Sequence, residues 1–244
     1  MKTLTLTVRT ADGRAEPVSA PLLQALLVGY TGRDRTQVLA HVQELAALGV
    51  APPARVPAVY VVDAGLVTTE SRVAVGSSHT SGEAEFYLLP TDRGLLVGAG
   101  SDHTDRAHER IDVAAAKARC PKPISREAWP FEEVRAHWDR LELRSWVPGG
   151  TGGTGEAGER GRRLYQESRL DALLPVDTLL AALAAAGHGD LSGRIVFGGT
   201  VPVRGEVVYG QRFEVELRDP VLGRRLTCAY DVVRTGSTAA DAYH

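Results

Sequence analysis

Alternating hydrophobic and polar residues predict several short strands along this chain. Leu4, Leu6 and Val8 alternate with polar residues over positions 2–9, as in a half-buried strand. The Asp12-Gly13 pair that follows is a hairpin signal and predicts a partner strand at residues 16–20. Apolar or alternating stretches with the same implication lie at residues 58–62, 141–147, 193–197, 211–218 and 224–233, and residues 22–30 form a short apolar segment.

Helical periodicity marks fewer segments. Asp34 is a good N-cap with Gln37 three residues later, so a helix is expected to run from there to about residue 48 and to end at Gly49. A second helix is expected over residues 104–119, with Ile111 on its buried face. Shorter helices are expected at 130–139 and at 176–186.

The order of these elements sets the fold class and the domain organisation. Many short strands with a few helices between them indicate an α+β fold rather than a βαβ array. A proline-rich connector at residues 51–57 divides the chain into a small N-terminal lobe (1–56) and a main domain (57–234). Residues 235–244 are expected to form a flexible tail.

One stretch, residues 80–106, carries three acids on a predicted hairpin. Glu83 and Glu85 are two residues apart in a strand, so both carboxylates point to one face. The residues of opposite parity are apolar and would pack inward: Ala84, Phe86 and Leu88. Asp102 directly follows the return strand. Three carboxylates at adjacent strand ends form an oxygen-only site that suits Mg²⁺, Mn²⁺ or Ca²⁺ rather than zinc. The alternative is a solvated hairpin with scattered acids.

Polar residues outside the hairpin add candidates. His41 and Glu44 share a helix face, so the carboxylate can orient and charge the imidazole; a solvated helix face is the alternative. His79 lies in a small polar passage and is either a substrate contact or a loop histidine bonded to backbone. Gly199 allows close backbone approach to a ligand, and Thr200 would present a hydroxyl and an amide to it.

Composition limits the classes of partner. The chain has 244 residues, 24% of them charged, and a formal net charge of −2; such a balance offers no basic patch for nucleic acid or an anionic membrane. No apolar run approaches the ~20 residues of a membrane span, and the N-terminus lacks the apolar core of a signal peptide. The two cysteines lie far apart, which favours a reducing compartment. We therefore expect a cytoplasmic protein.

Five motifs in order resemble those of the fumarylacetoacetate hydrolase-like superfamily, over roughly residues 29–233. The metal motifs are Glu83-Ala-Glu85 and, after the hairpin, Asp102-His-Thr-Asp-Arg106. The others are His41-Val-Gln-Glu44, the Ala-Lys117 segment with Cys120-Pro121, and Gly198-Gly-Thr200-Val-Pro202. The chain departs from the usual pattern before the lid histidine, in its Cys-Pro-Lys-Pro segment, and at Gly199 and Val201. It therefore resembles a divergent branch.

This resemblance implies a mixed β-roll with a small helical N-terminal lobe, often assembled as a dimer. It implies that Glu83, Glu85 and Asp102 bind the divalent cation, with Mg²⁺ expected first. Lys117, otherwise a solvated cation at a helix end, is then a substrate ligand beside the metal. Arg106 either pairs with the acids or holds a substrate carboxylate.

The leading hypothesis is a metal-dependent hydrolase that cleaves a C–C bond in a small oxo-acid or β-dicarbonyl substrate. In it His41, held by Glu44, activates water, while Lys117 and Arg106 neutralise the substrate carboxylate. Decarboxylation and tautomerisation would use the same residues and the same cation, so they are alternatives to hydrolysis. A non-catalytic binding module that keeps the fold, or a structural subunit that has lost the metal, is the alternative from another class.

Overall fold

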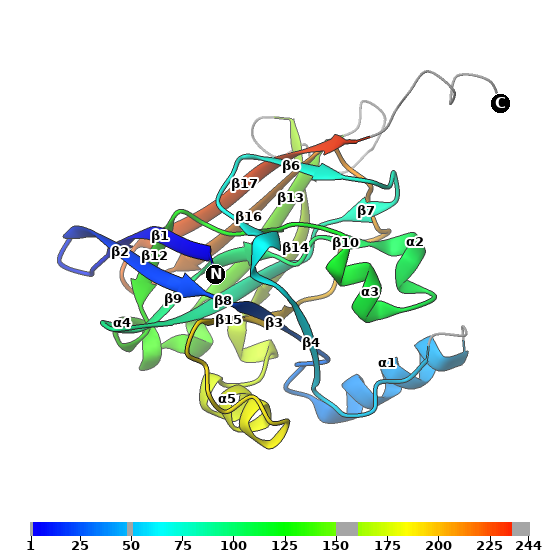
Figure 1. Ribbon diagram of the computed structural model, residues 1–244, viewed down its shortest axis with the longest axis horizontal. Helices are drawn as coiled ribbons and strands as arrows, with labels where there is room; N and C mark the ends of the chain where they lie inside the picture. The colour runs from blue at the N-terminus through cyan, green and yellow to red at the C-terminus, as the bar shows by residue number, and fades with distance from the viewer. Residues whose placement is uncertain (1, 48–50, 150–160, 236–244) are drawn as a thin grey trace.

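The computed structural model describes residues 2–47, 51–149 and 161–235, apart from the side chains of His41 and Leu45. It confirms the α+β class. The largest element is an eight-stranded sheet with strand order β2-β1-β12-β9-β8-β15-β3-β4 (Figure 1). Its strands are β1 (Lys2–Arg9), β2 (Ala15–Leu22), β3 (Gln24–Gly29), β4 (Ala58–Asp63), β8 (Ala84–Thr91), β9 (Gly94–Ser101), β12 (Glu127–Pro130) and β15 (Arg194–Thr200).

A second sheet has five strands in the order β14-β13-β16-β17-β6. They are β6 (Arg72–Val75), β13 (Glu142–Pro148), β14 (Arg162–Arg169), β16 (Arg212–Asp219) and β17 (Arg224–Arg234). Two small ladders complete the strands: β5 (Val67–Thr68) pairs with β11 (Lys122–Pro123), and β7 (Thr80–Ser81) pairs with β10 (Thr104–Asp105).

The helices lie around the sheets. They are α1 (Arg35–Ala47), α2 (Arg106–Glu109), α3 (Val113–Ala118), α4 (Glu132–Arg135) and α5 (Val176–Ala185), with 3₁₀ turns at Ala64–Leu66, Trp138–Arg140 and Leu170–Ala172. In Figure 1, α2 and α3 lie together beside the small β7–β10 ladder, and α1 lies apart at the periphery. Within the described ranges, no helix has the length and apolarity needed to cross a membrane.

The structure has two hydrophobic cores, one on each face of the first sheet. The first lies between the sheets and includes Phe86 and Leu88 of β8 and Leu217 of β16. The second includes Tyr87 and Leu89 of β8 and draws residues from all eight strands of the first sheet, which therefore curls around it. Because successive side chains of a strand point to opposite faces, β8 is buried on both faces. The inward packing expected for Ala84, Phe86 and Leu88 is confirmed, but the face that carries the glutamates is also buried.

One end of the curled sheet gathers four chain segments. In the register of the sheet, Ala84 pairs with Ser101 and Glu85 pairs with Thr200. Because β15 runs parallel to β3, the segment after Gly29 lies at this same end. The start of β8 and the ends of β3, β9 and β15 therefore meet there.

The structure contradicts the single helix expected over residues 104–119. Thr104 and Asp105 form a strand with β7, and the Asp105 side chain then caps α2 by accepting a hydrogen bond from the His108 amide. Asp112 begins a separate helix, α3, by accepting from the Ala115 amide. Two N-caps split the segment, and Ile111 between them is 79% exposed rather than buried.

Other sequence predictions fare differently. The Asp34 N-cap is confirmed, because its carboxylate accepts hydrogen bonds from the amides of Thr36 (2.9 Å) and Gln37 (3.2 Å). The helix expected at 130–139 is wrong: a short α4 is followed by a 3₁₀ turn. The division at residue 56 stays a prediction, and strands from both sides of it share the first sheet. Of the predicted tail, only Thr235 lies inside the described residues.

Candidate functional site

The structure brings the three predicted acidic ligands together at the gathered end of the first sheet. Glu83 directly precedes β8, Glu85 lies on β8, and Asp102 directly follows β9. The antiparallel pairing continues beyond the strands, where the Asp102 amide donates to the Glu83 carbonyl at 3.0 Å. One carboxylate oxygen from each residue lies within 4.8 Å of the other two. Local hairpin geometry therefore assembles the triad.

Two lysines neutralise part of this cluster. Lys117 Nζ lies 2.5 Å from Asp102 Oδ2 and 3.2 Å from Glu83 Oε2. Lys122 Nζ lies 2.8 Å from Asp102 Oδ1. Burial opposes ionisation of Asp102, but Lys117 and Lys122 outweigh it and hold the Asp102 pKa well below its usual value. Both carboxylates that contact Lys117 are thus ionised at neutral pH, since Arg106 and Lys117 also outweigh burial and lower the pKa of Glu83.

Glu85 is in a different electrostatic position from its neighbours. It is 3% exposed and accepts a hydrogen bond from the Gly199 amide at 2.6 Å. Within the described part of the chain, no lysine or arginine forms an ion pair with it. Burial, followed by the charges of Asp102 and Glu83, raises the pKa of Glu85 well above its usual value.

Arg106 is committed to the protein's own acids. Its Nη2 lies 3.0 Å from Glu83 Oε1, its Nη1 lies 2.9 Å from Glu109 Oε2, and its Nε donates to Ser81 Oγ at 2.6 Å. All three guanidinium nitrogens have a partner. Of the two roles open for Arg106, this geometry supports pairing with the acids.

Gly199 and Thr200 also use their polar groups internally. Gly199 has a φ of +98°, and a Cβ there would lie 1.8 Å from Thr31 Oγ1, so only glycine fits. Thr200 Oγ1 donates to the Ala84 carbonyl at 2.8 Å and accepts from Gln166 Nε2 at 2.8 Å. The Gly199 amide and the Thr200 hydroxyl therefore face β8, the strand that carries Glu85 of the triad.

Three side chains near the triad were missed in the sequence. Lys122 is completely buried; Pro123, which favours an extended conformation at the residue before it, is the only local signal for its strand. Tyr60 lies with its ring centroid 5.8 Å from Lys117 Nζ, and burial raises its pKa to about 12. Tyr30 has a φ of +59°, which is rare for a residue with a side chain and frequent at functional sites.

The other predicted site residues lie outside the acidic cluster, and the side chain of one of them lies outside the described residues. His79 is exposed, contacts Ser78 Oγ through Nδ1 at 3.1 Å and packs edge-on against Tyr209. Its backbone carbonyl accepts the Arg106 amide at 2.8 Å. His41 lies in α1, with its side chain outside the described residues, and Glu44 is exposed on the same helix. The role of the His41–Glu44 pair stays a prediction.

The residues present fit a hard divalent cation. The donor set is oxygen-only, as Mg²⁺ and Mn²⁺ prefer. Four carboxylates, those of Glu83, Glu85, Asp102 and Glu109, face three cationic side chains, those of Arg106, Lys117 and Lys122. With all four ionised, one negative charge would be left over; burial beside Asp102 and Glu83 raises the pKa of Glu85, so without a cation Glu85 favours its protonated form. A cation at the triad would balance that charge.

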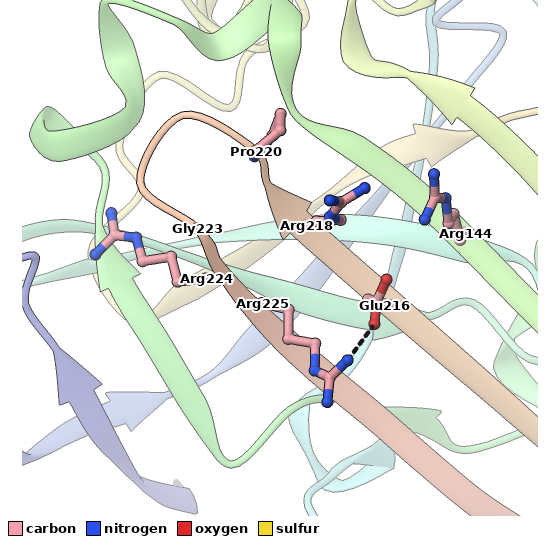
Figure 2. Close-up of a pocket in the computed structure, with 7 residues that line it drawn as sticks. All are labelled: Arg144, Glu216, Arg218, Pro220, Gly223, Arg224 and Arg225. Atoms are coloured by element: carbon pink, nitrogen blue, oxygen red, sulfur yellow. Dashed lines mark ion pairs between the residues drawn. The ribbon is translucent and has the colours of Figure 1, made fainter.

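A pocket of about 570 Å³ lies elsewhere, at the β16–β17 turn (Figure 2). Its lining is rich in arginine, but each arginine has an acidic partner. The pairs are Arg144 with Glu142 and Glu167, Arg218 with Glu142, Arg224 with Glu133 and Asp219, and Arg225 with Glu216. Its charges are therefore already compensated, and it does not compete with the triad as a candidate site.

A family model described as "Protein of unknown function (DUF2848)" matches residues 28–230. The chain belongs to this family. The match includes all three acids of the triad and most of both sheets, and it begins after β1 and β2. No curated protein matches the chain.

Solved structures resemble this DUF2848 protein in fold. A fumarylacetoacetate hydrolase family protein from Yersinia pestis CO92 has a TM-score of 0.57 at 16% identity, covering 93% of this chain and 100% of its own. The 5-carboxymethyl-2-hydroxymuconate delta-isomerase from Mycobacterium smegmatis has a TM-score of 0.58 at 16% identity, covering 92% and 86%. A 2-keto-3-deoxyarabinonate dehydratase gives 0.58 at 15%, covering 91% and 76%. The predicted fumarylacetoacetate hydrolase-like fold is confirmed.

Proposed function

We propose that this DUF2848 protein is a divalent-metal-dependent hydrolase that cleaves a C–C bond in a small oxo-acid or β-dicarbonyl substrate. The observation that carries the proposal is the convergence of Glu83, Glu85 and Asp102, one oxygen of each lying within 4.8 Å of the others, with no ion pair to Glu85 among the described residues. The fold supports it, since the neighbours described above include a hydrolase family protein, an isomerase and a dehydratase. We expect a cytoplasmic homodimer.

The triad would hold the cation, with Mg²⁺ as the first choice. When bound, the cation supplies Lewis-acid polarisation of a substrate carbonyl oxygen. Gly199 orients Glu85 through its amide hydrogen bond. Lys117 lies beside Glu83 and Asp102 with 7% of its side chain exposed and supplies positive charge for a substrate carboxylate.

The acid–base function is assigned to α1. We assign proton abstraction from the attacking water to His41 and orientation of its imidazole to Glu44. A residue on a peripheral helix meets its substrate when that helix closes over the site, so the catalytic contact need not exist in the free protein.

The test is turnover of a panel of 2,4-dioxo acids and β-oxo diacids with Mg²⁺ or Mn²⁺. Hydrolysis releases two carboxylic acids, decarboxylation releases CO₂, and tautomerisation changes only the enol absorbance. We expect hydrolysis that is lost with EDTA and in Glu83→Gln but kept in Glu16→Gln, a matched change at an exposed glutamate. Release of CO₂ or an enol change alone would assign the alternative reaction. Metal binding without turnover of any compound would favour a binding module.

Within the same assay, His41→Ala should lower kcat by about 10²–10⁴, the usual contribution of a positioned acid or base. Glu44→Gln should lower it less, because it only orients the imidazole. Gln43→Ala on the same helix is the matched control. Activity of His41→Ala within a few-fold of wild type would remove His41 from the mechanism.

A further inference from the structure

The hydrogen-bond ladder between β8 and β15 is interrupted beside the metal triad. Phe197 pairs with Tyr87 and Thr200 pairs with Glu85, with a register shift between the two pairs. The extra residue on β15 makes this a β-bulge, a feature that often re-aims groups next to functional sites. Here the Gly199 amide donates to the Glu85 carboxylate instead of to a backbone carbonyl.

Gln166 reaches this interruption from the second sheet. It lies on β14 and is completely buried. Its Oε1 accepts the Ala84 amide at 2.9 Å and Ser145 Oγ at 2.9 Å. Its Nε2 donates to Thr200 Oγ1 at 2.8 Å and to the Val201 carbonyl at 2.6 Å. A side-chain amide has two donor hydrogens and two acceptor sites, so Gln166 is fully satisfied and fixed in one orientation.

Thr200 closes a ring with Gln166 around a single residue. Its hydroxyl accepts from Gln166 and donates to the Ala84 carbonyl, while the Ala84 amide donates to Gln166. Both backbone polar groups of Ala84 are therefore held by the same two side chains. Ala84 lies between Glu83 and Glu85, so this ring fixes the backbone from which two of the three triad carboxylates extend.

We propose that Gln166 and Thr200 are positioning residues of the metal site, a role that rests on the proposed function. Three carboxylates within 4.8 Å of one another repel when they are ionised, and β8 lacks regular ladder bonds to β15 at this point. The ring replaces the missing ladder bonds and holds Glu83 and Glu85 in place before the cation arrives. Groups that orient metal ligands in this way typically change metal affinity 10–100-fold when they are mutated.

The test is the Mn²⁺ dissociation constant of the purified full-length protein, measured by calorimetry. Thr200→Val keeps the shape and removes both hydroxyl bonds, and Gln166→Met removes all four amide bonds. We expect each to weaken Mn²⁺ binding by about 10–100-fold. Thr200→Ser restores the hydroxyl and should bind within about threefold of wild type. Ser145→Ala removes a Gln166 bond that is not part of the ring and should also stay within threefold.

The double variant tests whether the two residues act as one unit. Because residues of one network are non-additive, Thr200→Val with Gln166→Met should bind Mn²⁺ within about threefold of the weaker single variant. Thermal unfolding without metal checks that each variant is folded, and Thr200→Val carries the test if Gln166→Met does not fold. A folded Thr200→Val that binds Mn²⁺ like wild type overturns the positioning role alone. Wild-type protein that binds no Mn²⁺ overturns the metal site itself and the positioning role with it.

Discussion

The triad and Asp219 are both buried carboxylate sites, yet their surroundings differ. Asp219 is completely buried at the end of β16. Its Oδ1 accepts from His137 Nε2 at 3.0 Å and from the amides of Val221 and Leu222, and its Oδ2 lies 3.3 Å from Arg224 Nε. Four donors thus surround one carboxylate. Figure 2 shows the turn that follows it, with Pro220 and Gly223 between the strands.

In the triad the donors are unevenly distributed: Arg106, Lys117 and Lys122 pair with Glu83 or Asp102, and none of these three pairs with Glu85. One oxygen from each of its three carboxylates lies within 4.8 Å of the other two. Glu85 accepts a hydrogen bond from the Gly199 amide and lies beside two other acids, Asp102 and Glu83. A buried charge needs compensation. Asp219 receives it from the protein itself, which indicates a structural role. Glu85 receives too little, so it favours its protonated form, and a cation bound at the triad would take the place of that proton. The balance between acids and donors therefore separates a structural acid from a metal ligand.

The largest expected difference between the two regions is in metal affinity. Glu85→Gln keeps the shape and an acceptor for the Gly199 amide but cannot supply an anionic oxygen to a cation, and we expect Mn²⁺ binding to fall by more than about 100-fold. Asp219→Asn, a matched carboxylate-to-amide change, should leave the affinity within about threefold. Calorimetry on both variants measures this. Equal binding by Glu85→Gln and wild type would remove Glu85 from the ligand set.

The next difference is in stability. Asp219→Asn replaces an acceptor of four hydrogen bonds by an amide that accepts at one atom only, and it removes one of the two acidic partners of Arg224. We expect the free energy of unfolding to fall by about 2 kcal/mol. Denaturant unfolding in EDTA measures it. In the same experiment Glu85→Gln should be at least as stable as wild type, because it relieves repulsion from Asp102 and Glu83. A Glu85→Gln variant that loses as much stability as Asp219→Asn would erase the distinction.

The sequence predicts the triad because its geometry is local. The two glutamates are fixed by strand parity, and the hairpin brings Asp102 beside them through eight consecutive pairs from Ala84 with Ser101 to Thr91 with Gly94. The sequence predicts the longer strands, such as β1, β8, β9 and β16, for the same reason: alternation and turn residues such as Gly94, with a φ of +99°, act over a few residues.

The surroundings of the triad could not be predicted in this way. Gln166 is 82 residues from Ala84 and reaches it only because the two sheets pack face to face. On its own strand it is one polar residue among several. The helix over residues 104–119 failed for a different reason: Asp105 and Asp112 are ordinary acids in the sequence, and their action as N-caps depends on where the β7–β10 ladder ends the strand.

The smallest expected effect is the pH dependence of the unfolding free energy of the same two variants without metal. Its direction is opposite for the two carboxylates. The folded-state pKa of Glu85 is raised, so its contribution to stability is complete below the unfolded pKa of about 4.3 and is lost as pH rises through the folded value. Burial opposes ionisation of Asp219, but the Leu222 amide and His137 outweigh it and lower its pKa. Its contribution is therefore present above about pH 3.9 and is lost as pH falls through the folded value.

The two variants should thus diverge from wild type in opposite directions as pH rises. In EDTA at about pH 4 the unfolding free energy of Glu85→Gln should match wild type, and toward pH 8 it should exceed it. Asp219→Asn should lie closest to wild type at the acid end and fall below it toward neutral pH. Denaturant unfolding at steps of one pH unit gives both differences. Parallel curves for Glu85→Gln and wild type would mean that Glu85 titrates alike in the folded and unfolded chains, and its burial between two acids would then have no electrostatic consequence.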